Sequence, residues 1–152
     1  MLPEPVFLDT SFILALLDTK DKWHKTAQKI ITSLDDNTVA VIGDAIIAET
    51  ISTAAKRIRE RRRFKQKEKE KLFIEFVENL KQFCLECEQI PLFSYAEKYF
   101  DSIVKNIIKT KGKLNFNDML IINACHSLEI KKILTFDNDF AEYMEIIRPE
   151  FK

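Results

Sequence analysis

The chain has 152 residues, 46% of them hydrophobic and 32% charged, and its 24 basic and 24 acidic residues give a formal net charge of zero. This composition excludes a disordered chain, and no apolar run approaches the roughly 20 residues that a membrane-spanning helix needs. We therefore expect one domain over residues 1–152, and, because the N-terminus shows no secretory signal pattern, a cytoplasmic location.

Short apolar runs alternate along the chain with longer stretches of helical periodicity. The runs predict strands at 6–8, 38–42, 90–93, 132–136 and 145–148. Helices are predicted at 12–17, 23–34, from 43 into a basic segment, at 72–84, at 94–112, from about 118, and at 138–143. Ser94 and Glu97 are spaced as a capping box for the helix at 94–112. Strands separated by helices predict a three-layer α/β/α domain with a mostly parallel sheet.

A basic segment interrupts this pattern. Residues 56–71 contain ten Lys or Arg and three Glu, a net charge of +7, so the rest of the chain carries the opposite charge. A solvated helix face and a surface for polyanions are about equally good interpretations.

Cysteine and histidine give little sign of a zinc site. Cys84 and Cys87 form one CxxC pair without a second pair at zinc spacing, so a half-buried helix end is the preferred interpretation. Cys125 lies in an apolar run and is expected in the core. His24 and His126 stand in no pattern typical of a catalytic triad, and we expect them to pack on helices or lie at the surface.

Four acidic residues occupy positions that a parallel sheet would bring together. Asp9 and Asp137 directly follow predicted strands, Glu49 lies within two helical turns of a third, and Asp118 opens a predicted helix. The carboxyl ends of parallel strands share one edge of the sheet, where ligands bind. Clustered carboxylates repel one another unless a cation neutralises them, and oxygen ligands favour Mg²⁺ or Mn²⁺ over zinc.

Each acid also has a purely structural interpretation. Asp9, Asp44 and Asp118 could be helix caps or first-turn acids, and Asp139 could cap the last short helix. Glu49 fits this interpretation poorly because it interrupts an apolar stretch. Capping therefore explains one or two of the acids well, but not four at strand ends together.

Four segments, in this order, carry a resemblance to a known family. LDTSFILALL at 8–17, the helix with Glu49, NDMLIINAC at 117–125 and LTFDNDF at 134–140 together resemble the PIN domain, and are most similar to VapC-type toxins of toxin-antitoxin pairs. The resemblance implies a parallel sheet of about five strands and a metal-dependent endoribonuclease that uses Mg²⁺ or Mn²⁺. It further implies that the catalytic and metal-binding acids are Asp9, Glu49, Asp118 and Asp137.

The same resemblance assigns supporting residues. Ser11 and Thr135 match the hydroxyl residues that flank the family's metal site, and Asp139 matches a frequent extra acid. The fourth ligand is therefore either Asp137 or Asp139, and Asp137 is preferred.

The segment at 56–87 is longer and more basic than in compact toxins of this family, so it could bind a partner peptide, such as an antitoxin protein, or RNA. The arginines that could contact RNA phosphates are Arg57, Arg59, Arg61, Arg62 and Arg63. Because VapC-type relatives pair, and because Tyr95, Tyr99 and Phe100 give one helix an aromatic surplus, we also expect a homodimer.

Three alternatives compete with a toxin nuclease. An RNA-processing PIN nuclease would keep the same acids, whereas a catalytically silent binding module would have lost one or more of them. A phospho-receiver domain needs an acid at the end of the central strand, and the predicted strand at 90–93 has none.

Overall fold

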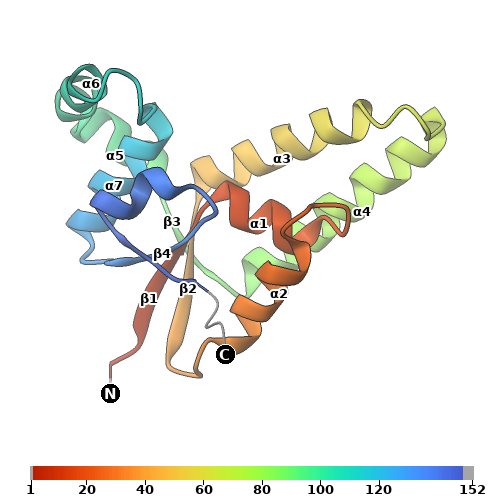
Figure 1. Cartoon of the computed structure of the whole chain (residues 1–152), viewed down its shortest axis with the longest axis horizontal. Coiled ribbons are helices and arrows are strands. Elements are labelled where there is room, and N and C mark those ends of the chain that lie inside the picture. Colours follow the sequence, from red (N-terminus) through yellow and green to blue (C-terminus); the bar gives the residue numbers. More distant parts are fainter. Residues whose placement is uncertain (1, 149–152) are drawn as a thin grey trace.

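The computed structural model describes residues 2–148, so residues 1 and 149–152 of the predicted domain lie outside the described part. Five parallel strands form one sheet in the order β3-β2-β1-β4-β5 (Figure 1). They are β1 (Glu4–Leu8), β2 (Thr38–Gly43), β3 (Glu88–Ile90), β4 (Lys132–Leu134) and β5 (Glu145–Ile146). The predicted parallel sheet of about five strands is confirmed.

Helices cover both faces of this sheet, which confirms the three-layer prediction. The helices are α1 (Thr10–Leu17), α2 (His24–Ser33), α3 (Asp44–Arg59), α4 (Gln66–Leu85), α5 (Leu92–Lys98), α6 (Phe100–Lys109) and α7 (Phe116–Ser127), with a short 3₁₀ helix η1 (Asn138–Glu142). In Figure 1, α1 to α4 lie to one side of the sheet and α5 to α7 to the other. The helices of the β1–β2 and β2–β3 connections thus cover one face of the sheet, and the helices between β3 and β4 cover the other.

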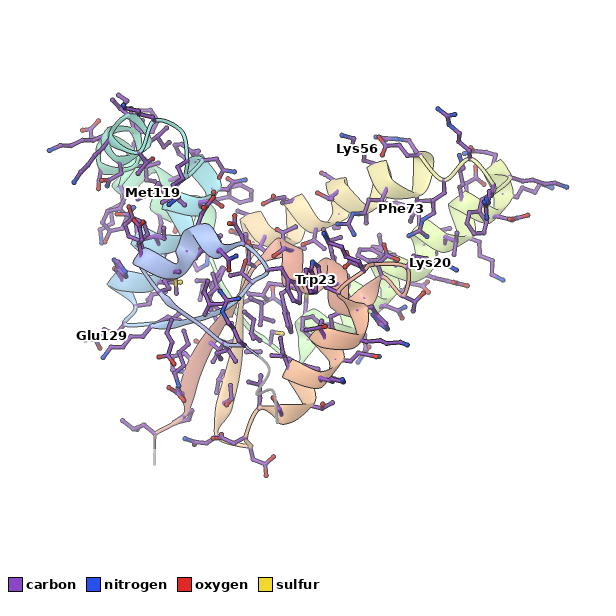
Figure 2. The ribbon with its side chains drawn as sticks, in the orientation of Figure 1. Lys20, Trp23, Lys56, Phe73, Met119 and Glu129 are labelled. Atoms are coloured by element: carbon purple, nitrogen blue, oxygen red, sulfur yellow. The ribbon has the colours of Figure 1, made fainter. Side chains whose placement is uncertain are left out.

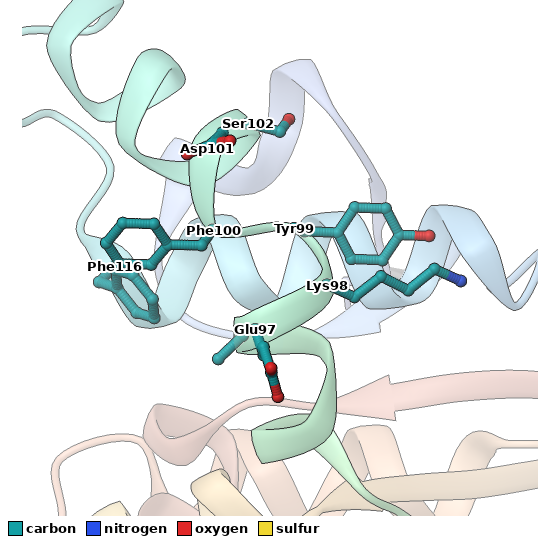
Figure 3. A pocket seen from close by; sticks show the side chains of 8 residues that line it. Glu97, Lys98, Tyr99, Phe100, Asp101, Ser102 and Phe116 are labelled. Atoms are coloured by element: carbon teal, nitrogen blue, oxygen red, sulfur yellow. The ribbon is translucent and has the colours of Figure 1, made fainter.

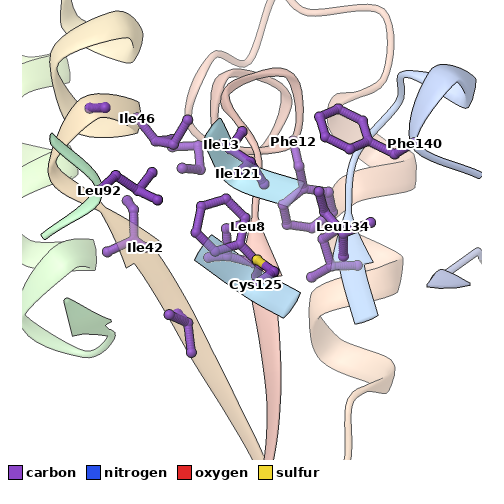
Figure 4. Close-up of a cluster of buried hydrophobic side chains, with 14 of the residues drawn as sticks. Leu8, Phe12, Ile13, Ile42, Ile46, Leu92, Ile121, Cys125, Leu134 and Phe140 are labelled. Atoms are coloured by element: carbon purple, nitrogen blue, oxygen red, sulfur yellow. The ribbon is translucent and has the colours of Figure 1, made fainter. Parts of the chain in front are cut away.

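The core is centred on β1, the first strand in the chain and the middle one in the sheet. Phe7 and Leu8 are fully buried, and Figure 4 shows Leu8 between side chains from both helical layers. Strands buried on both faces are expected to be continuously apolar, as the run Val6-Phe7-Leu8 is. Cys125 is part of this core, as predicted.

The CxxC pair and both histidines have the structural roles expected of them. Cys84 is buried near the end of α4, and Cys87 is partly buried just beyond it. One ring nitrogen of His24 lies 2.8 Å from the carbonyl oxygen of Ala15, and one of His126 lies 3.1 Å from that of Tyr143.

The sequence prediction was wrong between residues 90 and 112. The third strand ends at Ile90, and α5 begins at Leu92, so Ser94 and Glu97 do not form a capping box; instead, the Ser94 hydroxyl donates to the carbonyl oxygen of Pro91 at 2.7 Å. Leu92 is fully buried, and a Cβ added at Gly43 would lie 2.1 Å from one of its methyl carbons. The early helix start thus seats Leu92 on Gly43. The predicted helix 94–112 is in fact two helices that meet at Tyr99.

The helices α3 and α4 form an antiparallel hairpin that projects away from the sheet (Figure 1). The basic segment forms the end of α3, the connecting turn and the start of α4, and Figure 2 shows Lys56 on the outer part of this hairpin. Over residues 2–148, no helix combines the length and the apolar character needed to cross a bilayer.

Candidate active site

The first acid, Asp9, lies at the centre of the sheet's carboxyl edge. From β1 the chain continues to β2 and β3 on one side, and it later returns to β4 and β5 on the other side of β1. The strand order therefore reverses at the carboxyl end of β1, and open α/β sheets bind ligands at such a position. Asp9 is 8% exposed and occupies the N-cap position of α1, but its carboxylate makes no capping hydrogen bond. Capping therefore does not explain why a carboxylate is buried here.

Two hydroxyl groups hold the Asp9 carboxylate. The Thr135 hydroxyl, just after β4, donates to Oδ2 of Asp9 at 2.7 Å, and the Ser11 hydroxyl donates to the same oxygen at 3.3 Å. These hydroxyls also accept main-chain N–H groups: Phe136 donates to Ser11, and Asp137 donates to Thr135, both at 3.0 Å. The network joins the loops that follow β1 and β4 and fixes the orientation of Asp9.

Asp137 and Asp139 follow β4 and begin η1. Oδ1 of Asp137 accepts the N–H of Asp139 at 2.9 Å, so Asp137 is the cap of this short helix. The structural interpretation that assigned this cap to Asp139 was wrong by two residues. Asp139 instead lies 4.0 Å from the ammonium group of Lys113.

Asp118 and Glu49 come from α7 and α3. Asp118 forms a capping box with Asn115: its N–H donates to the Asn115 side chain at 2.9 Å, and its Oδ2 accepts the Asn115 N–H at 3.1 Å. Glu49 is partly buried, and its Oε2 lies 3.5 Å from the side-chain nitrogen of Asn117. The structural and the functional interpretations of Asp118 are thus compatible, because one of its oxygens caps the helix.

The four acids lie close enough to repel one another. Burial, the largest cause, raises the pKa of Asp118 to about 6, and the negative charges of Asp9, Asp137 and Glu49 add to the rise. Burial also raises the pKa of Asp9, an effect to which Glu49 contributes and which the Thr135 hydrogen bond opposes. The strand-end acids predicted from the sequence therefore share one electrostatic environment.

The donor set suits a hard divalent cation. Within residues 2–148, none of Asp9, Glu49, Asp118 and Asp137 forms an ion pair with Lys, Arg or His, so their charge is not neutralised by the protein. Carboxylate oxygens are the ligands that Mg²⁺ and Mn²⁺ prefer. In the described part of the chain, however, no three Asp, Glu, His or Cys side chains are already arranged to hold one ion. The chemistry of the residues thus fits such a cation, although their side chains are not yet closed around one position.

An open pocket of about 540 Å³ is lined by Asp137 and Asp139, and the sequence did not predict it. Ser11 and Asp137 form one part of its wall, and Trp23 and Phe136 form another. No local sequence pattern identified Trp23, because its partner Phe136 is remote in the sequence and only the fold brings the two rings together.

The five arginines predicted to contact nucleic acid fall into two groups. Arg57 lies 2.8 Å from Asp21 and Arg61 lies 2.9 Å from Asp18, both acids of the loop between α1 and α2. The other three, Arg59, Arg62 and Arg63, are exposed and form no ion pair over residues 2–148.

The geometry defines an α/β/α domain with an acidic cluster at the point where its parallel sheet reverses strand order. The PIN domain family matches residues 6–145, and the chain belongs to this family. The predicted resemblance is therefore confirmed.

Solved structures of similar fold include VapC20 from Mycobacterium tuberculosis, described as a Sarcin-Ricin loop cleaving toxin. It is 20% identical, with a TM-score of 0.71 over 95% of this chain and 99% of the other. VapBC2 from Rickettsia felis, solved with a DNA fragment from their promoter, is 15% identical, with a TM-score of 0.65 over 94% and 97% of the two chains. Both similarities concern the fold. No curated protein matched the chain.

Proposed function

We propose that the chain is a metal-dependent endoribonuclease that hydrolyses RNA phosphodiester bonds with Mg²⁺ or Mn²⁺. The observation that carries this proposal is the convergence of four acids from β1, α3, α7 and the loop after β4, with no basic partner among the described residues and with the pKa of Asp118 raised to about 6. Membership of the PIN family and the description of the M. tuberculosis structure as a Sarcin-Ricin loop cleaving toxin support it.

Asp9, Glu49 and Asp118 would hold the cation, with Asp137 or Asp139 as the fourth acid, and Asp137 preferred. A divalent ion bound there would stabilise negative charge on the phosphate and make hydroxide available near neutral pH. Thr135 and Ser11 bind the same oxygen of Asp9, which keeps the carboxylate in one orientation. The capping box holds Asp118 in the first turn of α7.

The test incubates labelled single-stranded RNA with wild type, Asp118→Asn and Glu78→Gln in Mg²⁺, Mn²⁺ or EDTA. Asp118→Asn should lose cleavage, because it removes the charge while keeping the shape. Glu78→Gln removes the same charge from an exposed acid of α4 outside the cluster and should cleave like wild type. Activity that persists in EDTA, or in Asp118→Asn, would refute the proposal.

We further propose that this nuclease is the toxin of a toxin-antitoxin pair, with an antitoxin protein as its partner. The solved relatives named VapC20 and VapBC2 support this role. An RNA-processing PIN nuclease is the alternative with the same chemistry. A short neighbouring reading frame whose product relieves growth inhibition by this chain would support the toxin, and harmless expression of the active chain alone would refute it.

A homodimer through α5 and α6 completes the proposal. Phe93, Phe100 and Ile108 are exposed there, and Phe100 packs against Phe116 beside an open pocket of about 830 Å³ (Figure 3). Light scattering should give a dimer mass, and Phe100→Glu should shift it toward the monomer, whereas the exposed Lys105→Glu should not. A monomer mass for wild type at high micromolar concentration would refute the dimer.

A further inference from the structure

The open pocket beside the acids contains a stacked aromatic pair. The Trp23 and Phe136 rings are nearly parallel, at 8°, with centroids 5.2 Å apart, and Phe136 in turn stacks on Phe12 of the core at 6.0 Å. Trp23 is nevertheless 42% exposed, so the stack ends in an indole ring that is accessible from the pocket. A large aromatic ring that is this exposed beside a candidate active site is a candidate for ligand binding.

The main chain around Trp23 is held firmly. Its N–H donates to the Asp21 carboxylate at 2.8 Å, and its carbonyl oxygen accepts the N–H of Ala27, the first such bond of α2. The next residue, His24, is anchored to Ala15. Figure 2 shows Trp23 at the end of the loop that joins α1 to α2. A ring fixed in this way binds a flat ligand with little loss of conformational entropy.

Charged side chains of both signs surround this ring. Asp21, Asp137 and Asp139 line the pocket together with Lys22 and Arg57, and Arg57 pairs with Asp21 at 2.8 Å. The carboxylates of Asp137 and Asp139 disfavour a phosphate directly on Trp23, but they do not disfavour an uncharged nucleobase. Stacking needs only a π face, and every base has one.

We propose that Trp23 is the stacking platform for a nucleobase next to the scissile phosphate of the RNA. This inference rests on the proposed ribonuclease function. Ser11 and Asp137 line the same pocket, so a base on Trp23 belongs to the nucleotide chain that passes the acids. The site takes single-stranded RNA, because a base that is paired and stacked in a helix does not offer its face.

Lys22 supplies the adjoining charge. Its ammonium group lies 5.4 Å from the centre of the Trp23 ring and forms no ion pair within the described residues. Phe136 covers one face of the indole, so this cation marks the electron-rich open face. Since the Lys22 side chain is exposed, it can swing aside for a base and pair with the phosphate of the same nucleotide.

Trp23 is the only tryptophan in the chain, so its fluorescence reports directly on this site. The experiment titrates Asp118→Asn, which is expected to bind RNA without cutting it, with short oligoadenylate RNA, and follows both tryptophan emission and the anisotropy of a labelled RNA end. Stacking of adenine should quench the emission in step with binding. An abasic oligonucleotide of equal length and charge should bind more weakly and leave the emission unchanged.

Variants give a second readout. Trp23→Leu should raise the KM for single-stranded RNA about tenfold, in line with the loss of one stacked base, and change kcat little, whereas Trp23→Phe should recover most of the loss. Leu128→Ala removes a similarly exposed apolar side chain that does not line this pocket and should behave like wild type. Circular dichroism checks that each variant is folded.

The outcomes separate this inference from the proposed function. RNA that binds without quenching, or a Trp23→Leu enzyme with the KM of wild type, would overturn the stacking site while cleavage by wild type still stands. Quenching by oligoadenylate without any cleavage by wild type would keep the stacking site and refute the nuclease.

Discussion

Asp118 takes part in two opposing interactions. One of its oxygens accepts the Asn115 N–H and stabilises the start of α7, while its charge is repelled by Asp9, Asp137 and Glu49. Because the pKa of Asp118 is raised to about 6 in the folded protein, its ionised form destabilises the metal-free fold.

This conflict predicts a pH-dependent difference between metal-free wild type and Asp118→Asn. Between about pH 4 and 6 the unfolded chain releases the Asp118 proton before the folded one does, so wild type loses stability as the pH rises through this window. Above it the variant should be more stable by on the order of 1–2 kcal/mol, after allowance for solvent screening. Thermal unfolding in EDTA from pH 4 to 7.5 measures this, and a constant difference would contradict it.

A bound cation should remove the same repulsion, so Mg²⁺ or Mn²⁺ is expected to stabilise the folded state. At a concentration about 100 times its Kd, a ligand adds roughly 2.7 kcal/mol to the free energy of unfolding. Asp9→Asn and Asp118→Asn should lose most of this gain, whereas Glu78→Gln, at an exposed position of α4, should retain it. An equal melting shift in all four proteins would place the ion elsewhere.

The acids were accessible to sequence reasoning through local features: Asp9 and Asp137 follow strands, Asp118 lies at a helix start, and Glu49 interrupts an apolar stretch. Trp23 was not, because its stacking depends on Phe136 after β4, and no local pattern joins these two positions. The pairing of Arg57 and Arg61 escaped for a similar reason, since Asp18 and Asp21 lie in an irregular loop.

At the scale of elements, two arginines fasten α3 to the loop that follows α1. Nη2 of Arg61 lies 2.9 Å from both oxygens of Asp18, and the two side chains are only 22% and 12% exposed. Arg57 bonds Asp21 at 2.8 Å in the same loop, which also carries Trp23. These contacts hold the end of α3 and the start of the connecting turn of the α3–α4 hairpin against the α1–α2 loop.

Removing one partner should leave the other charge partly buried and uncompensated. Arg61→Gln is therefore expected to destabilise the fold by about 1–3 kcal/mol. Arg62→Gln, the neighbouring exposed arginine, should change stability by less than about 0.5 kcal/mol. Urea unfolding compares the two, and equal losses would show that the ion pair contributes nothing specific.

The exposed arginines of the hairpin should act on RNA rather than on stability. If Arg59, Arg62 and Arg63 each neutralise one phosphate, their joint replacement by Gln should weaken binding and reduce the slope of log K against log salt by about 2. The measurement is RNA affinity at several salt concentrations.

A matched control replaces three exposed lysines on and just after α6, Lys105, Lys109 and Lys111, with Gln, which changes the net charge equally. The control should keep the slope of wild type. If both triple variants lose the same amount, the effect is one of net charge, and the hairpin has no particular role in RNA binding.

The sequence predicted element boundaries where local residues define them, and its prediction was wrong where tertiary packing determines where a helix begins. The Gly43-Asp44 start of α3 was predicted from local residues. At Leu92, burial against Gly43 began a helix two residues before the Ser94 cap that the sequence favoured, and Tyr99 divided one periodic stripe into two helices.

At the scale of the whole molecule, the strand order places the first strand in the middle of the sheet. β1 pairs with β2, which follows it closely in the chain, and with β4, which comes near the other end. Two hydrogen bonds to Asp9 lie at the end of the β1–β4 pairing. The Asp9 N–H donates to the Leu134 carbonyl oxygen at 3.0 Å, and the Thr135 hydroxyl donates to the Asp9 carboxylate.

This order has a consequence for the chain while it is being translated. Asp9 leaves the ribosome before Thr135 does, so until residues 132–135 have emerged Asp9 lacks its hydrogen bond from Thr135 and one edge of β1 is unpaired. Chains stalled before Lys132 should therefore bind no Mg²⁺ and cut no RNA, which stalled-ribosome assays with labelled RNA can measure. If the chain is the ribonuclease proposed above, a nascent chain acquires that activity only after β4 has left the ribosome.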